Sequence, residues 1–292
     1  MRNKNLYQTV TDSIVSALEE ADPQDIPWRK SWSGSFMPRN GHSGRMYRGI
    51  NVPYLWSVAL NRGYDSNQWF TYNGARAAGG HVKRGEKSQA DVIYWKLMKK
   101  DKNIPDSKAF PLIRSYAVFN EAQCEGIETI AALSDTMHTK RQAEALLAIH
   151  ACDAQHREGE PCYIPSADTI EMPPEDAFWN TNRYLATYFH ELSHWTGHEK
   201  RLDRKFIHRA EEELIAELGS CYCCAYFDLL DAKNESDAVK YLDSWVKAMK
   251  EDNRYIFKAA RNGFEAANYI LGNPDELSAE EKPETSMTVT RQ

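Results

Sequence analysis

The 292-residue sequence predicts an α+β fold, with an N-terminal α+β domain followed by a mostly helical domain. Apolar residues recur at helical spacing through most of the second half, whereas the first half also holds two strand-like runs. The charge divides in the same way. Residues 1–125 carry 18 Lys and Arg against 12 Asp and Glu, and the remainder carries 18 against 30. This asymmetry indicates units with different partners, so we expect domains at 1–130 and 131–272 and a disordered polar tail at 273–292.

The first part is expected to begin with an amphipathic helix, because Val10, Ile14 and Leu18 share one face. Loops and short elements should follow, since residues 27–80 are rich in Pro, Gly, Asn and aromatic side chains. The elements expected in chain order are helices at 6–20 and 52–61 and strands at 91–98 and 111–120.

The second part is expected to be built mainly from helices. Its most clearly marked helix can be capped by Asn180 or Thr181 and ends at Gly197, a typical C-terminal residue. The other expected elements are helices at 139–151, 209–231, 237–250 and 253–271 and short strands at 163–164 and 169–170.

Residues 190–194 read His-Glu-Leu-Ser-His inside that marked helix. Because residues four apart lie on one face of a helix, His190 and His194 can hold one metal ion from the same side. Glu191 can reach a metal-bound water as the general base. The pattern is that of a zinc metallopeptidase, so we expect Zn²⁺, with another divalent metal as the alternative.

A catalytic zinc site needs a third protein ligand and an open position for water. Glu213 lies 19 residues after His194 in a second predicted helix, and Glu217 lies one helical turn further on. We assign Glu213 as the third ligand and Glu217 as the carboxylate that hydrogen-bonds a ligand histidine. The acidic surroundings leave Glu212 and Glu217 open as alternative ligands.

His198 is a rival third ligand, since it follows Gly197 directly. In the three-histidine version of the motif the third histidine would stand where this chain has Lys200. We therefore expect His198 to cap the helix or to face the substrate. His198 and Tyr222 are the candidate donors to the oxyanion of a peptide under attack, and the strand at 169–170 is expected to pair with an extended substrate.

Residues 27–100 combine 13 Lys and Arg with three acids and twelve aromatic residues. This mixture suits single-stranded nucleic acid, because cations follow the phosphates and exposed bases stack on aromatic rings at about 1–3 kcal/mol each. Half or more of the aromatic residues must nevertheless belong to the core of so small a domain. The expected DNA-contacting residues are Trp28, Arg29, Arg39, Arg45, Tyr47, Arg48, Trp69, His81, Lys83, Arg84 and Lys87.

Over nearly all of residues 5–272 the chain resembles the ArdC-type antirestriction proteins of plasmids and phages, which relate to the N-terminal part of TraC-type primases. The resemblance is carried by Pro27-Trp28-Arg29, residues 38–51, Trp69, 79–87, 116–120, 189–198, Arg201-Leu202 and 212–218. It implies an N-terminal domain that binds single-stranded DNA, a zincin-like metallopeptidase domain, and protection of mobile DNA from host restriction. The narrower match to gluzincin sites implies that Glu213 binds zinc and that a later acid orients a histidine.

Two classes of function remain open. The first is a protease recruited by DNA, which cuts a protein or peptide substrate such as a host restriction or repair factor. The second is a protector that coats DNA and whose metal domain is structural or docks a protein. A two-metal nuclease fits poorly. Such sites hold two metal ions about 4 Å apart between carboxylates, whereas this chain offers one His-Glu-Leu-Ser-His motif.

The sequence gives no sign of a membrane partner. Its apolar runs fall short of the roughly 20 residues of a membrane span, and Met1–Asn5 is not followed by the apolar core of a signal peptide. We therefore expect the protein in the cytoplasm of the host cell.

Overall fold

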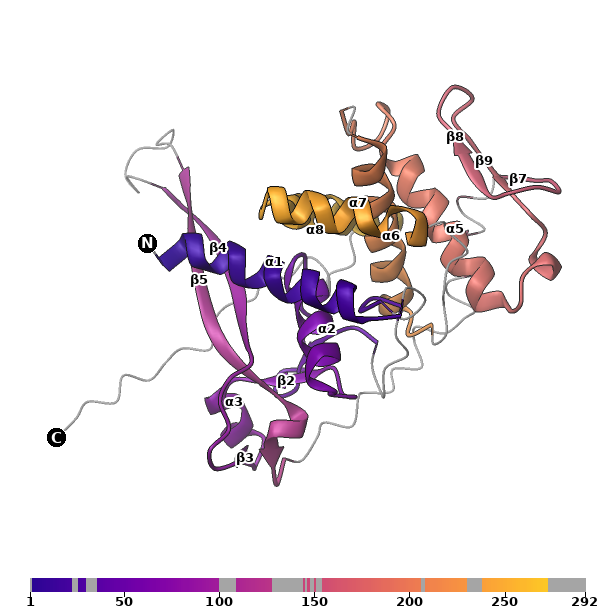
Figure 1. Ribbon diagram of the computed structural model, residues 1–292. Coiled ribbons are helices and arrows are strands. Elements are labelled where there is room, and N and C mark those ends of the chain that lie inside the picture. Colours follow the sequence, from indigo (N-terminus) through magenta and orange to yellow (C-terminus); the bar gives the residue numbers. More distant parts are fainter. Residues whose placement is uncertain are drawn as a thin grey trace.

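The structure, a computed structural model, describes residues 2–22, 26–29, 36–99, 109–127, 144, 146–147, 150, 154–205, 208–229 and 238–272. The fold mixes helices and sheets, as the sequence predicts. The long strands belong to the first half, and long helices dominate the described part of the second half (Figure 1). Within the described residues, every helix is too short or too polar to cross a membrane.

The first half combines a four-stranded sheet with helices. Its elements are α1 (Arg2–Glu20), β1 (Arg39–Asn40), α2 (Asn51–Arg62), β2 (Gln68–Phe70), α3 (Tyr72–Ala77), β3 (His81–Val82), β4 (Ala90–Lys99), β5 (Ala109–Asn120), η1 (Glu121–Gln123) and β6 (Cys124–Glu125). The sheet order is β1-β2-β5-β4, with β1 and β2 parallel and the other pairs antiparallel, while β3 pairs with β6. The four elements expected in this half are confirmed.

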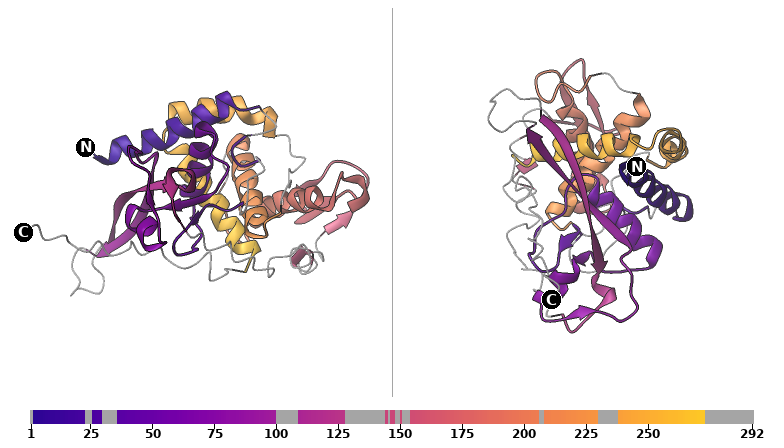
Figure 2. Two further views of the ribbon diagram at one scale, coloured as in Figure 1. Left: turned by 90° about the horizontal axis from the view of Figure 1, so that it is seen from below. Right: turned by 90° about the vertical axis from the view of Figure 1, so that its left-hand side faces the viewer.

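Helix α1 forms because its apolar residues lie on one stripe. Val10, Ile14 and Leu18 are buried, and the helix packs along α2 and also reaches α7 of the second half. Gly63 ends α2 in the left-handed conformation at φ 65°, which costs glycine little. Helix α1 therefore lies beside α2 and beside a helix of the second half (Figure 2).

The second half is a helical cluster with a small sheet beside it. Its elements are β7 (Ala154–His156), β8 (Cys162–Ile164), β9 (Thr169–Met172), η3 (Glu175–Ala177), α5 (Thr181–Thr196), α6 (Arg209–Tyr226), α7 (Ala238–Glu251) and α8 (Tyr255–Ile270). The sheet order is β7-β9-β8, with β9 parallel to β7 and antiparallel to β8. The expected short strands and the helices near 181–197, 209–231, 237–250 and 253–271 are confirmed, except that α6 ends at Tyr226 and residues 227–229 are not helical.

Helices α5 and α6 approach each other closely. Asn180 caps α5 by accepting a hydrogen bond from the backbone N–H of Arg183. A Cβ atom on Gly219 of α6 would lie 2.5 Å from Oγ of Ser193 on α5, which leaves room only for glycine. The face of α5 that carries the two histidines is therefore held directly against α6.

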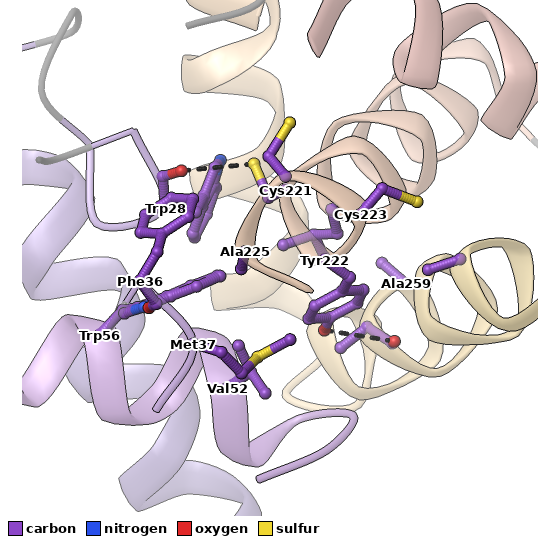
Figure 3. Close-up of a cluster of buried hydrophobic side chains, with 14 of the residues drawn as sticks. Trp28, Phe36, Met37, Val52, Trp56, Cys221, Tyr222, Cys223, Ala225 and Ala259 are labelled. Carbon is purple, nitrogen blue, oxygen red and sulfur yellow. Dashed lines mark hydrogen bonds between the residues drawn. The ribbon is translucent and has the colours of Figure 1, made fainter. Parts of the chain in front are cut away.

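The two halves share one continuous hydrophobic core. Trp56 of α2 stacks between Phe36 and Tyr222 of α6, with ring centroids 5.3 and 6.5 Å away (Figure 3). The thiol of Cys221 donates to the carbonyl oxygen of Trp28 at 3.3 Å. Side chains of the first half therefore complete the packing around α6.

The boundary expected at 130/131 stays a prediction, since residues 128–143 lie outside the described part of the chain. Most of the helix expected at 139–151 also lies outside the described part of the chain. Its described residues, 144, 146, 147 and 150, are helical. The expected tail at 273–292 also lies outside the described residues.

Candidate metal centre

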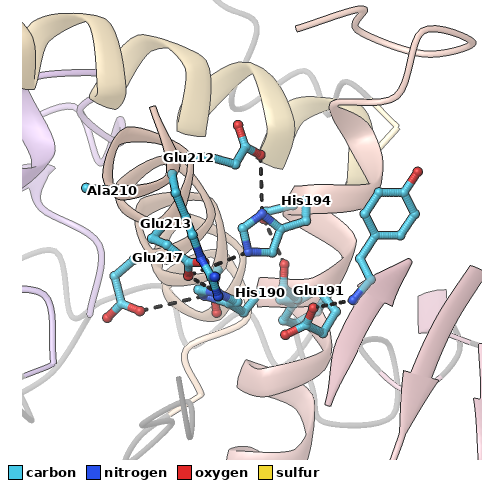
Figure 4. A network of polar contacts seen from close by, with 12 residues as sticks. His190, Glu191, His194, Ala210, Glu212, Glu213 and Glu217 are labelled. Atoms are coloured by element: carbon cyan, nitrogen blue, oxygen red, sulfur yellow. Dashed lines mark hydrogen bonds and ion pairs between the residues drawn. The ribbon is translucent and has the colours of Figure 1, made fainter. Parts of the chain in front are cut away.

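Helices α5 and α6 bring two imidazoles and a carboxylate together (Figure 4). His190 and His194 occupy successive turns of α5, and Glu213 faces them from the second turn of α6. Oε2 of Glu213 lies 3.5 Å from Nε2 of His190 and 3.8 Å from Nε2 of His194. One ligand atom from each residue falls within 4.8 Å of the other two, which fits a single ion. Two imidazoles and one glutamate form a His₂Glu donor set of the kind that catalytic zinc sites use.

The far side of each imidazole faces a second carboxylate. Nδ1 of His194 lies 3.2 Å from Glu212, and Nδ1 of His190 lies 3.7 Å from Glu217. Successive residues on a helix point about 100° apart, so Glu212 and Glu213 cannot reach the same spot. Of the acids left open by the sequence, Glu213 alone faces both Nε2 atoms, while Glu212 and Glu217 lie beside Nδ1 of His194 and of His190. The roles assigned to Glu213 and Glu217 stay predictions.

Each outer carboxylate is held by an arginine. Glu212 accepts from the Arg204 guanidinium at 2.6 Å, and Glu217 accepts from Arg29 at 2.6 and 3.1 Å. The sequence reasoning considered Glu212 only as an alternative ligand and missed Arg204. Glu212 stands one residue before Glu213 on a helix, whereas Arg204 sits in the loop before α6, where spacing gives no guide.

The charges of the site act strongly on one another. Burial lowers the pKa of His194, but Glu212 and Glu213 outweigh it and raise that pKa to about 10. Burial favours the neutral form of Glu213, yet His190 and His194 hold its pKa well below the usual range. The pocket thus attracts positive charge, which a proton supplies when no metal is bound.

Glu191 lies at the wall of a cleft of about 1360 Å³ that also exposes the two histidines and Glu213. Its side chain is turned toward β8, where Oε2 accepts the backbone N–H of Tyr163 at 2.8 Å. Strand β9 is paired on both sides, so the expectation that residues 169–170 pair with substrate is wrong. The strand edge that faces the site belongs to β8.

The two candidate oxyanion donors lie in different places. His198 lines the cleft but stands outside the cluster of ligand atoms, and its Nδ1 accepts the backbone N–H of Lys200 at 3.2 Å. Tyr222 is fully buried and donates to the carbonyl oxygen of Gly49 at 3.1 Å. The expectation for Tyr222 is therefore wrong, because its hydroxyl is engaged in the core away from the cleft.

The residues expected to contact DNA divide into a buried and an exposed group. Trp28, Tyr47 and Trp69 are at most 1% exposed, and Arg29 is buried against Glu217. DNA contact by these four does not fit the structure, because a buried ring offers no face to a base. Arg39 and Arg48 are half-buried, and the exposed group consists of Arg45, His81, Lys83, Arg84 and Lys87.

The exposed cations gather on the segment 81–87, which contains β3 and the turn before β4. Helix α3 packs beside β3 and carries Tyr72, whose side chain is 56% exposed. Tyr72 is the aromatic residue near this segment that the sequence reasoning did not single out. Sequence periodicity could not find it, since α3 is only six residues long.

Two family models match the chain. One describes the N-terminal domain of the anti-restriction factor ArdC and matches residues 4–119, and the other describes a zincin-like metallopeptidase and matches residues 141–262. A DNA primase TraC of Escherichia coli is 30% identical over 92% of this chain, which spans only 27% of that protein. The uncharacterized protein y4eC of Sinorhizobium fredii is 31% identical over 91% of both chains.

Solved structures agree with the family models. The metal-free crystal structure of the antirestriction protein ArdC from plasmid R388 has a TM-score of 0.74 and 36% identity, and covers 95% of this chain and 99% of that one. The Mn(II)-bound structure of the same protein has a TM-score of 0.74 and 38% identity, and covers 92% and 97%. With the fold, the zincin-like half and the full-length match in agreement, the chain belongs to the ArdC family of antirestriction proteins.

Proposed function

We propose that this protein binds single-stranded DNA and carries a divalent-metal site of the metallopeptidase type, and that it protects plasmid or phage DNA from host restriction in the cytoplasm. The observation that carries the metal site is the convergence of His190, His194 and Glu213, with Glu191 beside them in an open cleft. The His₂Glu set favours zinc. The Mn(II)-bound structure of R388 ArdC supports a divalent ion more generally.

A metal bound there supplies Lewis-acid chemistry at the floor of the cleft. Glu191 is the residue placed to take a proton from an attacking water and to return it to the leaving amine. Glu191 accepts a hydrogen bond from the backbone N–H of Tyr163 through one carboxylate oxygen, which leaves the other oxygen for the proton transfer. The edge of β8 would pair with an extended peptide, which brings a main-chain carbonyl toward the ligands.

The support for DNA binding lies on the other half. The exposed cations of segment 81–87 and Arg45 offer partners for phosphates, and Tyr72 offers a ring for a base. The proposed protein substrate is a host restriction or repair factor, since such a protein would be met on incoming DNA.

One observation favours the alternative of a protector that coats DNA without proteolysis. The carboxylate of Glu191 is engaged by the protein's own strand through the Tyr163 N–H. In this alternative the cleft is a structural or protein-docking surface, and strand coating alone shields the DNA.

The variant Glu191→Gln separates the two proposals. It should retain the metal and the affinity for an oligo-dT strand but lose peptide cleavage, because an amide cannot accept the proton. Glu199→Gln, an exposed change in the loop after α5, is the matched control and should behave like wild type. Full antirestriction in cells by Glu191→Gln would establish the coating alternative, and cleavage by Glu191→Gln at the wild-type rate would refute the peptidase mechanism.

A further inference from the structure

A turn of the first half reaches into the metal centre. Residues 26–29 form a hydrogen-bonded turn in which Ile26, Trp28 and Arg29 are buried. The turn is fastened to α6 at two points, by the thiol of Cys221 on the Trp28 carbonyl and by Arg29 on Glu217. Its side chains thus belong to the packing of α6 and not to the surface of the first half.

The carboxylate of Glu217 is shared unequally between Arg29 and His190. Oε1 accepts Nε–H of Arg29 at 2.6 Å, while Oε2 accepts Nη2–H at the longer distance of 3.1 Å. The same Oε2 atom lies 3.7 Å from Nδ1 of His190. Among the described residues, that buried nitrogen has no hydrogen-bond partner. A buried polar atom of this kind calls for a partner, and Oε2 is within a small movement of it.

We propose that Arg29 is a positioning residue of the metal centre, which holds the Glu217 carboxylate where Nδ1–H of His190 can donate to it. The proposal rests on the metal site proposed above. His190 turns Nε2 toward Glu213, so a ligand role for Nε2 leaves the proton on Nδ1. A carboxylate that accepts this proton fixes the ring orientation and raises its basicity as a ligand.

The shape of the guanidinium matters for this role. Arginine grips both carboxylate oxygens with a planar fork, and so sets the rotation of the carboxylate as well as its position. A lysine at position 29 would keep the charge but bind as a single point, which frees Glu217 to rotate away from His190. The first half of the chain thereby supplies part of the support around a metal bound by the second half.

The test is Co²⁺ binding to the full chain, followed by the visible absorption of the bound ion and by competition with a chelator. The first variant is Arg29→Lys, which keeps the positive charge but loses the planar guanidinium. The second is Glu217→Asp, which keeps the negative charge but shortens the side chain. The matched control is Lys258→Met, which breaks the 2.7 Å ion pair between Lys258 of α8 and buried Glu211. Glu211 is on α6, as Glu217 is, but is not among the clustered ligand residues. Circular dichroism and thermal unfolding without metal establish that each variant is folded.

We expect Arg29→Lys and Glu217→Asp each to weaken Co²⁺ binding by about 10- to 100-fold and to shift the absorption band, as changes to the carboxylates around metal sites do. Lys258→Met should stay within about twofold of wild type, as expected for a change outside that support. Wild-type affinity in folded Arg29→Lys would overturn the positioning role while leaving the metal site intact. An equal loss in Lys258→Met would overturn it too, by revealing a general effect of stability. Failure of the wild-type protein to bind Co²⁺ would remove the metal site itself.

Discussion

The exposed cations of segment 81–87 give the most direct test of DNA binding. Lys83, Arg84 and Lys87 are all exposed, so replacing them by alanine disturbs little of the fold. Surface changes of this kind usually alter stability by less than about 0.5 kcal/mol each. A loss of DNA affinity in the triple variant would therefore report on contact with DNA and not on unfolding.

The size of the effect follows from counterion release. Each phosphate neutralised on a single strand contributes about 0.7 to the slope of log K against log salt. Removing the three cations that neutralise phosphates should lower the magnitude of the slope by about 2 and, near 0.1 M salt, the affinity by about 100-fold. The assay is fluorescence anisotropy with a labelled oligo-dT strand over a range of salt concentrations.

The control carries the same change of net charge at another place. Lys247, Lys250 and Arg261 are exposed on α7 and α8, and their replacement by alanine removes three cations far along the chain from segment 81–87. This control variant should leave the slope of log K against log salt unchanged. The reasoning is refuted if the 81–87 variant binds with the wild-type slope, or if both triple variants lose affinity equally.

Two further predictions concern the core and the metal. Trp56→Ala should cost about 3–5 kcal/mol of unfolding free energy, because Trp56 is fully buried between Phe36 and Tyr222. Urea denaturation followed by circular dichroism should still show one transition, and separate transitions for the two halves would contradict the shared core. Metal binding should release about one proton between pH 7 and 9, since the pKa of His194 is raised to about 10 and a ligand imidazole must be neutral. The apparent metal affinity should thus rise with pH across that window, as an indicator dye in weak buffer would record, whereas binding without proton release would count against the raised pKa.

Local pattern was sufficient for the long helices, for the two long strands and for the grouping of His190, His194 and Glu213. The repeat of apolar residues predicted α1, α5 and α6 because each helix buries one stripe. Spacing also brought His190, His194 and Glu213 together, since it is fixed by helix geometry and one short connection.

The sequence could not predict which residues of the first half pack against the second half. Trp28 and Arg29 have the composition of a nucleic-acid contact, yet they are buried because α6 lies over them. That contact joins positions 188 residues apart, and no local pattern encodes it. The edge strand beside the site was missed for the same reason, because strand order depends on pairing between β7, β8 and β9.

The charges around the two imidazoles explain why this centre suits a divalent ion. Among the residues that the structure describes, the buried or partly buried charged groups there are Glu191, Glu212, Glu213 and Glu217, with Arg29 and Arg204. Arg209 and Lys205 also border the cleft, but their side chains are 82% and 84% exposed, so water screens them. Four carboxylates and two guanidinium groups leave two negative charges, which are costly away from water. A proton on His194 cancels one of them, whereas a divalent ion between neutral imidazoles cancels both. The raised pKa of His194 and the preference for a divalent ion thus have the same physical cause.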